Sequence, residues 1–461
     1  MTWVFYFIKF GSALFVLPLI LLNFSEAEIA VWFLFMLILS MALIADSGFG
    51  STIIRATSYY YSGMKNIPKN IDEFKNHTEK KNDINFIGLS NLLNTFNIAY
   101  IFLGLLSIVI LLIWGQFIVS NAISMTNNVN FLTYAFYIII FRSFLAIQFI
   151  KWSSFIQGID KVADIKKAES VSELFKILFM FIFLTFGYGI FELMIIECIF
   201  TIAILVYAKR YVYKWFLKNN KTYSIKYEFN NDLFSSIWPA TWRFGAMQYG
   251  GFIINNGTSI IVSQLNSPTL IVSFLLTQKL IFFIKQIAQA PLYSNLPKIF
   301  QMMAIKDYNN LKPYCAKAII IGLSIQLIAL ILLLTIGTNL LEFFNINATL
   351  VPLSIMLVMA ISIMLELHHA YHAQIYMGSN HVPFLLPAIL SGILILSLGF
   401  GIINTYGLIG IVLVQFFVQL SLNNWYPIYL NLKLLDWKFI DYLKCLINYK
   451  RCTQKNKKDK E

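Results

Sequence analysis

Long apolar runs separated by short polar connections recur along the whole chain. A helix that crosses a bilayer needs about 20 predominantly apolar residues, and twelve windows of this kind can be marked out. They cover residues 3–22, 29–61, 84–113, 130–157, 171–187, 190–208, 236–263, 268–297, 314–336, 350–377, 382–403 and 407–429. The pattern predicts an all-α polytopic membrane protein with about twelve transmembrane helices.

Charged residues are too scarce to cover a water-soluble surface of this size. Of the 461 residues, 58% are hydrophobic and 12% are charged, whereas a soluble domain carries about 25% charged residues. The composition therefore excludes a soluble globular protein and agrees with the twelve windows.

Basic residues gather in alternate connections. With the N-terminus inside, 26 of the 35 lysines and arginines lie in 62–83, 158–170, 209–234, 298–312 and 430–461, and the opposite connections hold none. Because cytoplasmic loops are enriched in Lys and Arg, we expect both termini in the cytoplasm. The net charge of +13 is largely a topology signal, and nucleic-acid binding is not needed to explain it.

The most hydrophilic connection follows the sixth window and divides the chain. It predicts two six-helix lobes, 1–208 and 235–430, joined by a basic cytoplasmic linker at 209–234 and arranged around a central cavity, as in several transporter folds. In the tail, 431–461, an apolar stripe at helical spacing runs from Leu432 to Leu446. This stripe predicts an amphipathic helix over 432–450 that lies on the inner leaflet.

Several ionisable residues fall too deep in the windows to reach the membrane surface. Such groups are costly in hydrocarbon, so they usually face a partner or a wet cavity. The cations are Arg55, Arg142, Arg243, Lys279 and Lys285, and the anions are Asp46, Glu197 and Glu366. One interpretation is that they pair as inter-helix clamps. Because full pairing would leave two cations over, the other is a hydrated interior with surplus positive charge, suited to an anionic cargo.

The stretch ADSGFGSTIIR, residues 45–55, interrupts the second window with Asp46, Gly48 and Gly50. Glycines either let helices pack closely or break a helix so that backbone groups line a cavity. Here we expect a break, because Asp and Ser side chains can bond the freed amides of the following turn. Gly250 and Gly251 in YGG present the same two alternatives.

The segment ELHHAYH, 366–372, places His368 and His372 one turn apart. The zinc-protease pattern would need Glu at position 369, and no third ligand is apparent, so a metal site is disfavoured. A titrating polar stripe of Glu366 and His369 and a plain inter-helix hydrogen-bonding role both remain open.

No pattern in the chain supports enzyme chemistry. It has no Walker A sequence, no dinucleotide-binding glycine loop after a strand, and no soluble domain large enough for an active site. We expect a protein without cofactors, in which transport is driven by an ion gradient or by downhill flow of the substrate.

Three segments of the chain resemble those of a known transporter superfamily. They are ADSGFGSTIIRATSYYYSG at the end of the second window, WPATWRFGAMQYGGFI at the start of the second lobe, and PLYSNLPKIFQMMAIKD after the eighth window. The chain resembles the multidrug/oligosaccharidyl-lipid/polysaccharide (MOP) exporter superfamily, and within it the Wzx-type flippases of O-antigen and capsule loci. The resemblance implies a bacterial inner-membrane protein. Its substrate would be an undecaprenyl-pyrophosphate-linked oligosaccharide, moved from the cytoplasmic to the periplasmic leaflet by alternating access.

The resemblance also implies which residues would meet the substrate. The family's cavity is lined by spans 1, 2, 7 and 8, which here carry Lys9, Asp46, Arg55, Arg243, Lys279 and Lys285. Arginine offers a two-pronged donor for pyrophosphate oxygens, and Trp242, Gln248, Tyr249 and Asn255 would face the sugars. Implied partners are a polysaccharide polymerase and a chain-length regulator. Three alternatives remain open. The surplus of cations argues against a multidrug antiporter of the same superfamily, the lack of two additional windows argues against a lipid II flippase, and the short outer connections argue against a polymerase of the same loci.

Overall fold

In a computed structural model the protein is helical throughout the part that the structure describes, which comprises residues 16–44, 46, 48–64, 83–219, 228–304, 307–346, 348–377 and 383–447. No strand occurs in these ranges. Each of the twelve predicted windows falls on a helix, the first being described only from residue 16. The contacts divide the chain into two compact units, Met1–Tyr249 and Gly250–Glu461.

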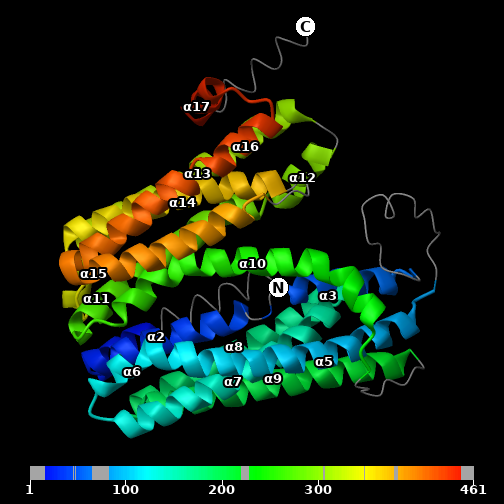
Figure 1. Ribbon diagram of the computed structural model, residues 1–461, viewed down its shortest axis with the longest axis horizontal. Coiled ribbons are helices and arrows are strands. Elements are labelled where there is room, and N and C mark those ends of the chain that lie inside the picture. The colour runs from blue at the N-terminus through cyan, green and yellow to red at the C-terminus, as the bar shows by residue number, and fades with distance from the viewer. Residues whose placement is uncertain are drawn as a thin grey trace. The chain divides into compact units, whose positions relative to one another are not determined.

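The first unit is built around one central helix. Its helices are 16–23, α2 (Glu26–Ile44), α3 (Phe49–Tyr61), α5 (Phe86–Ile110), the π-helical turn η1 (Leu111–Gly115), α6 (Gln116–Ser124), α7 (Val129–Gly158), α8 (Val162–Thr185), α9 (Ile190–Lys218) and the first half of α10 (Asn231–Val262). α7 packs against α2, α3, α5, α8 and α9, and the last two run alongside it in Figure 1.

The close contact between α3 and α7 depends on a glycine. A Cβ atom at Gly158 would lie 2.4 Å from the Cβ of Thr57, so only glycine lets the two helices approach this closely. The hydroxyl of Ser58 also donates to the carbonyl of Gly158 at 3.1 Å. α3 is thereby fixed along one side to the centre of the unit.

The second unit contains the rest of α10, α11 (Pro268–Tyr293), α12 (Leu296–Ala304), α13 (Tyr308–Phe343), α14 (Leu353–Met377), α15 (Leu385–Leu422), α16 (Tyr426–Leu434) and α17 (Phe439–Ile447). α15 is interrupted by Gly407, whose φ of 58° and ψ of −148° are not helical. The amide of Asn423 donates to the hydroxyl of Ser391 at 2.6 Å. The chain therefore folds back at Gly407, and α15 is a hairpin that holds two predicted windows.

Seven helical stretches of the described chain are long and apolar enough to cross a membrane, by length and composition. Their outer surfaces are rich in exposed apolar side chains such as Phe102, Phe141 and Ile328, which suits contact with lipid. The prediction of an all-α, multi-pass membrane protein is confirmed.

The prediction of one continuous tail helix over 432–450 is wrong, because the structure has two short helices there. α16 ends at Leu434, Asp436 adopts a left-handed φ of 45°, and α17 begins at Phe439. The break turns Tyr442 and Cys445 inward, while Phe439, Ile440 and Ile447 stay exposed. Residues 448–461, which complete the predicted basic tail, lie outside the described residues, as do Lys9 and most of the loop at 62–83.

Candidate functional site

The second predicted span is broken, as the sequence led us to expect. α2 ends at Ile44 and α3 begins at Phe49, and between them Gly48 has a left-handed φ of 78°. One carboxylate oxygen of Asp46 accepts the amide of Gly50 at 2.9 Å, and the other accepts the hydroxyl of Tyr100 at 2.5 Å. Asp46 thus caps α3 and joins the break to α5. Ser47 lies outside the described residues.

Gly50 is also held close to α7. A Cβ atom at this position would lie 3.0 Å from Oδ2 of Asp46 and 3.1 Å from both Ile150 and Ser154. Both alternatives raised by the sequence, a helix break and close packing, therefore apply to this glycine pair. At the second motif only close packing is seen, because Gly250 faces the backbone of Ala388 within a continuous α10.

α3 presents an exposed polar face, one member of which, Ser58, also bonds Gly158 of α7. Its apolar side, with Phe49, Ile53 and Tyr60, is buried. The exposed residues follow helical spacing on another side; they are Ser51, Arg55, Ser58 and Ser62. The three serine hydroxyls each donate to a backbone carbonyl of the preceding turn, so it is the guanidinium of Arg55 that is unsuited to hydrocarbon and makes this face suit contact with water although α3 continues a membrane span.

α10 contacts α3 and brings a second arginine to the first unit. The hydroxyls of Thr52 and Thr241 are 3.0 Å apart in a buried contact between the two helices. Arg243 is exposed, with its guanidinium carbon 5.8 Å from the ring centroid of Trp242. Among the described residues, neither Arg55 nor Arg243 forms an ion pair.

Two exposed tryptophans precede Arg243 on α10. Trp238 is 46% and Trp242 is 43% exposed, and Trp238 stacks on Phe234 with ring centroids 5.6 Å apart. Trp238 was not among the residues that the sequence led us to expect at the site. Its spacing of four residues from Trp242 on a helix was the signal that could have found it.

In the first unit, Arg142 is neutralised by a buried acid. Nη2 of Arg142 lies 3.2 Å from Oε2 of Glu197, whose other oxygen lies 2.9 Å from Nζ of Lys176. Lys176 also contacts Glu173 at 2.9 Å. The four charges balance on α7, α8 and α9, so these contacts favour the clamp interpretation for Arg142. Lys176 turns inward toward these acids, and its side chain is only 13% exposed.

In the second unit, Lys285 and Glu366 form an ion pair between α11 and α14. Nδ1 of His369 lies 2.9 Å from the amide oxygen of Asn424. Lys279 is half-buried on α11, with its ammonium 5.4 Å from the ring centroid of Phe283. Lys285 is thus paired with an acid of α14. Lys279 lies six residues earlier on α11, near Phe283.

His368 and His372 join α14 to the tail helix. The hydroxyl of Tyr442 lies 2.5 Å from Nε2 of His368 and 2.9 Å from Nε2 of His372. Nδ1 of His372 also meets the amide of Asn431 at 2.9 Å. Burial raises the pKa of Tyr442, so its phenol stays protonated and donates to one imidazole while the other donates to it. The geometry matches the inter-helix hydrogen-bonding interpretation for these two histidines.

No group of three or more potential metal ligands occurs within the described ranges.

Comparisons with known proteins identify the fold. One solved structure with this fold is the lipid II flippase MurJ in an inward closed conformation. It has 14% sequence identity and a TM-score of 0.66, and the match covers 96% of this chain and 90% of that one. A multidrug resistance MATE family transporter of the MOP superfamily, facing inward, has 12% identity, a TM-score of 0.63, and coverage of 96% of each chain.

A third structure with this fold comes from Pyrococcus furiosus. It is a MOP superfamily transporter described as having a binding pocket of reverse polarity that suggests a different function, with 12% identity, a TM-score of 0.55, and coverage of 97% of this chain and 94% of that one. No family model and no curated protein sequence matches the chain. The chain therefore has the fold of MOP superfamily transporters.

Proposed function

We propose that this protein is a MOP-type flippase that moves an undecaprenyl-pyrophosphate-linked oligosaccharide from the cytoplasmic to the periplasmic leaflet of a bacterial inner membrane. The observation that carries the proposal is the exposed face of α3, with Ser51, Arg55, Ser58 and Ser62. A hydrated, positively charged surface on a membrane span has a physical use if the substrate brings negative charge into the membrane region.

Pyrophosphate is the substrate group that this surface fits. A guanidinium binds phosphate oxygens through two parallel charge-assisted hydrogen bonds. Arg55 and Arg243 are exposed on helices that touch through Thr52 and Thr241. Trp242, next to Arg243, and Trp238, one turn before Trp242, offer large amphipathic surfaces against which sugar rings could pack. We include Lys279 as a further lumen residue and reassign Arg142 and Lys285 to structural clamps.

The break at Asp46 suits alternating access. A left-handed Gly48 between two helices is a point where backbone angles can change, and Asp46 fixes its present geometry through Gly50 and Tyr100. We propose these residues as the hinge. Glu366, with Lys285 and His369 nearby in the second unit, is our candidate for coupling transport to an ion gradient.

The two kinds of transporter named in the comparisons differ in cargo. A cationic drug would favour an acidic surface, whereas the exposed polar face of α3 carries a guanidinium and no carboxylate. The protein from Pyrococcus furiosus, described as having a pocket of reverse polarity, indicates that this fold accommodates more than one polarity. We place both termini in the cytoplasm, on the strength of the lysine distribution, and expect a polysaccharide polymerase and a chain-length regulator as partners.

Reconstituted flipping tests the proposal. Proteoliposomes would be loaded with undecaprenyl-pyrophosphate oligosaccharide, and its transfer between leaflets followed with a glycosidase added outside. We expect Arg55→Gln and Arg243→Gln each to slow flipping at least tenfold, since a hydrogen bond to a charged group is worth about 1.5–3 kcal/mol. Lys218→Gln, at the exposed end of α9, is the control and should keep the wild-type rate.

Two results would overturn the proposal. One is wild-type flipping by both arginine variants at normal protein levels. The other is ion-driven movement of a cationic drug without any movement of the lipid, which would identify the multidrug antiporter instead.

A further inference from the structure

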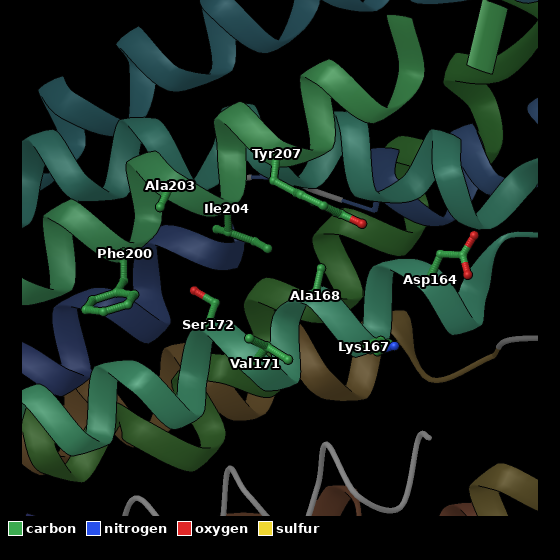
Figure 2. Close-up of a pocket in the computed structure, with 9 residues that line it drawn as sticks. All are labelled: Asp164, Lys167, Ala168, Val171, Ser172, Phe200, Ala203, Ile204 and Tyr207. Carbon is green, nitrogen blue, oxygen red and sulfur yellow. The ribbon is translucent and has the colours of Figure 1, made fainter. Parts of the chain in front are cut away.

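An open groove lies between α8 and α9 in the first unit. Its volume is about 520 Å³, within the range of roughly 300–1,000 Å³ typical of small-molecule sites. Small side chains, Ala168 and Ser172 of α8 and Ala203 of α9, leave space between the two helices, as Figure 2 shows. The transport function proposed above uses no residue of this groove.

The groove changes character along its length. Val171, Phe200 and Ile204 line one end, whereas Lys167 and Tyr207 lie toward the other. From Asp164 to Ser172 the groove follows α8 for about 12 Å at 1.5 Å per residue. The part beyond the polar end, from Ala168 to Ser172, accounts for about 6 Å of this length, which is less than half of the ~15 Å hydrocarbon thickness of one leaflet. A molecule that fills the groove must therefore be polar at one end and apolar at the other.

The apolar end of the groove belongs to a surface that suits hydrocarbon. On the same helices Leu174 is 49%, Leu178 is 46% and Ile199 is 54% exposed. Exposed apolar side chains at this density, on helices that cross the membrane, are expected to meet lipid tails. The groove is thus accessible to the bilayer.

The polar end carries positive charge. Segments 160–169 and 207–214 contain six basic residues and three acidic ones. One of the acids, Asp164, accepts the hydroxyl of Tyr211 at 2.5 Å, and another, Glu169, is paired with Lys166 at 2.6 Å. Lys167 is exposed at the rim. The lysine distribution places this end at the cytoplasmic surface, where anionic lipid headgroups are found.

We propose that the α8–α9 groove is a binding site for an anionic phospholipid of the cytoplasmic leaflet. The phosphate meets Lys167 at the rim, the phenol of Tyr207 lies at headgroup level, and one acyl chain follows Val171 and Ile204 between the helices. The occupant is a resident lipid of the membrane and is separate from the transported lipid.

The test uses phosphatidylglycerol with a photoactivatable group on one acyl chain, in nanodiscs that hold the full-length protein. We expect crosslinks to map to 168–172 and 200–204. Ala203→Trp fills the groove and should lower labelling at least fivefold. Lys167→Gln should lower it about fivefold, the equivalent of the roughly 1 kcal/mol that one basic residue contributes near an anionic surface.

Matched controls separate the groove from the surface around it. Ile202→Trp adds the same ring to an exposed position of α9 outside the groove, and Lys218→Gln removes a charge beyond it; both should label like wild type. Melting temperatures within 2 °C of wild type would show that the variants fold. Unchanged labelling in Ala203→Trp would overturn the proposal, as would equal labelling by a phosphatidylcholine probe or stronger labelling by a polyprenyl phosphate probe.

Discussion

Glu197 holds two cations in a buried cluster on three helices of the first unit, and its removal gives a sharp prediction. The side chains of Glu197, Lys176 and Arg142 are only 9%, 13% and 18% exposed. Glu197→Gln leaves Arg142 without its acid and leaves Lys176 with Glu173 alone. Removing one partner of a buried pair costs about 3–5 kcal/mol, and the remaining Glu173 places the expected loss near 3 kcal/mol.

Thermal melting in detergent measures this loss. For a unit of this size 1 kcal/mol corresponds to about 2–4 °C, so we expect the melting temperature to fall by about 6–12 °C. Glu342→Gln, at an exposed position near the end of α13, makes the same chemical change and should shift it by less than 2 °C. Adding Arg142→Gln to Glu197→Gln removes the stranded cation and should restore part of the stability.

A Glu197→Gln protein that melts like wild type would refute the clamp interpretation. If such a protein also lost flipping, Arg142 and Glu197 would belong to the transport path, which was the other interpretation of the sequence.

Three further changes test individual contacts. Tyr100→Phe removes the hydroxyl that donates to Asp46. The free energy of unfolding should therefore fall by about 1–3 kcal/mol, as measured by denaturant titration. Tyr442→Phe removes the group that two histidines share; α17 should detach, and limited trypsin should cut the tail faster while the rest stays intact. Gly322→Ala would place a Cβ atom 1.7 Å from the hydroxyl oxygen of Tyr371, so stability should fall by about 1–3 kcal/mol, and Tyr371→Phe in the same chain should recover part of it.

The helices were predictable because the bilayer imposes length and apolarity on each span. The break at Asp46 and Gly48 could also be predicted, since an acid, a hydroxyl and two glycines within a span have few other uses. The interruption of the tail at Asp436 could not, because the apolar stripe from Leu432 to Leu446 keeps helical spacing across it. Tertiary contacts made by Tyr442 with α14 decide that turn, and local spacing does not record them.

The sequence predicts how many deep cations must lack an acidic partner, but it does not predict which ones. The sequence showed that acids were too few to neutralise every deep cation. It did not show that Arg142 and Lys285 would receive the acids while Arg55 and Arg243 would not. That assignment depends on which faces of neighbouring helices meet, and one residue of rotation moves a side chain by about 100° around a helix.

The central claim is that the face of α3 with Arg55 is wet and receives a pyrophosphate headgroup. The most direct measurement is the rate at which a membrane-impermeant thiol reagent modifies Ser51→Cys, taken as the increment over wild type. Phe141→Cys, on an exposed apolar surface of α7, is the comparison in lipid. We predict that Ser51→Cys reacts at least tenfold faster, and that undecaprenyl-pyrophosphate oligosaccharide protects it while undecaprenol does not. Equal rates at the two positions, or a Ser51→Cys rate that the pyrophosphate lipid leaves unchanged, would contradict the account.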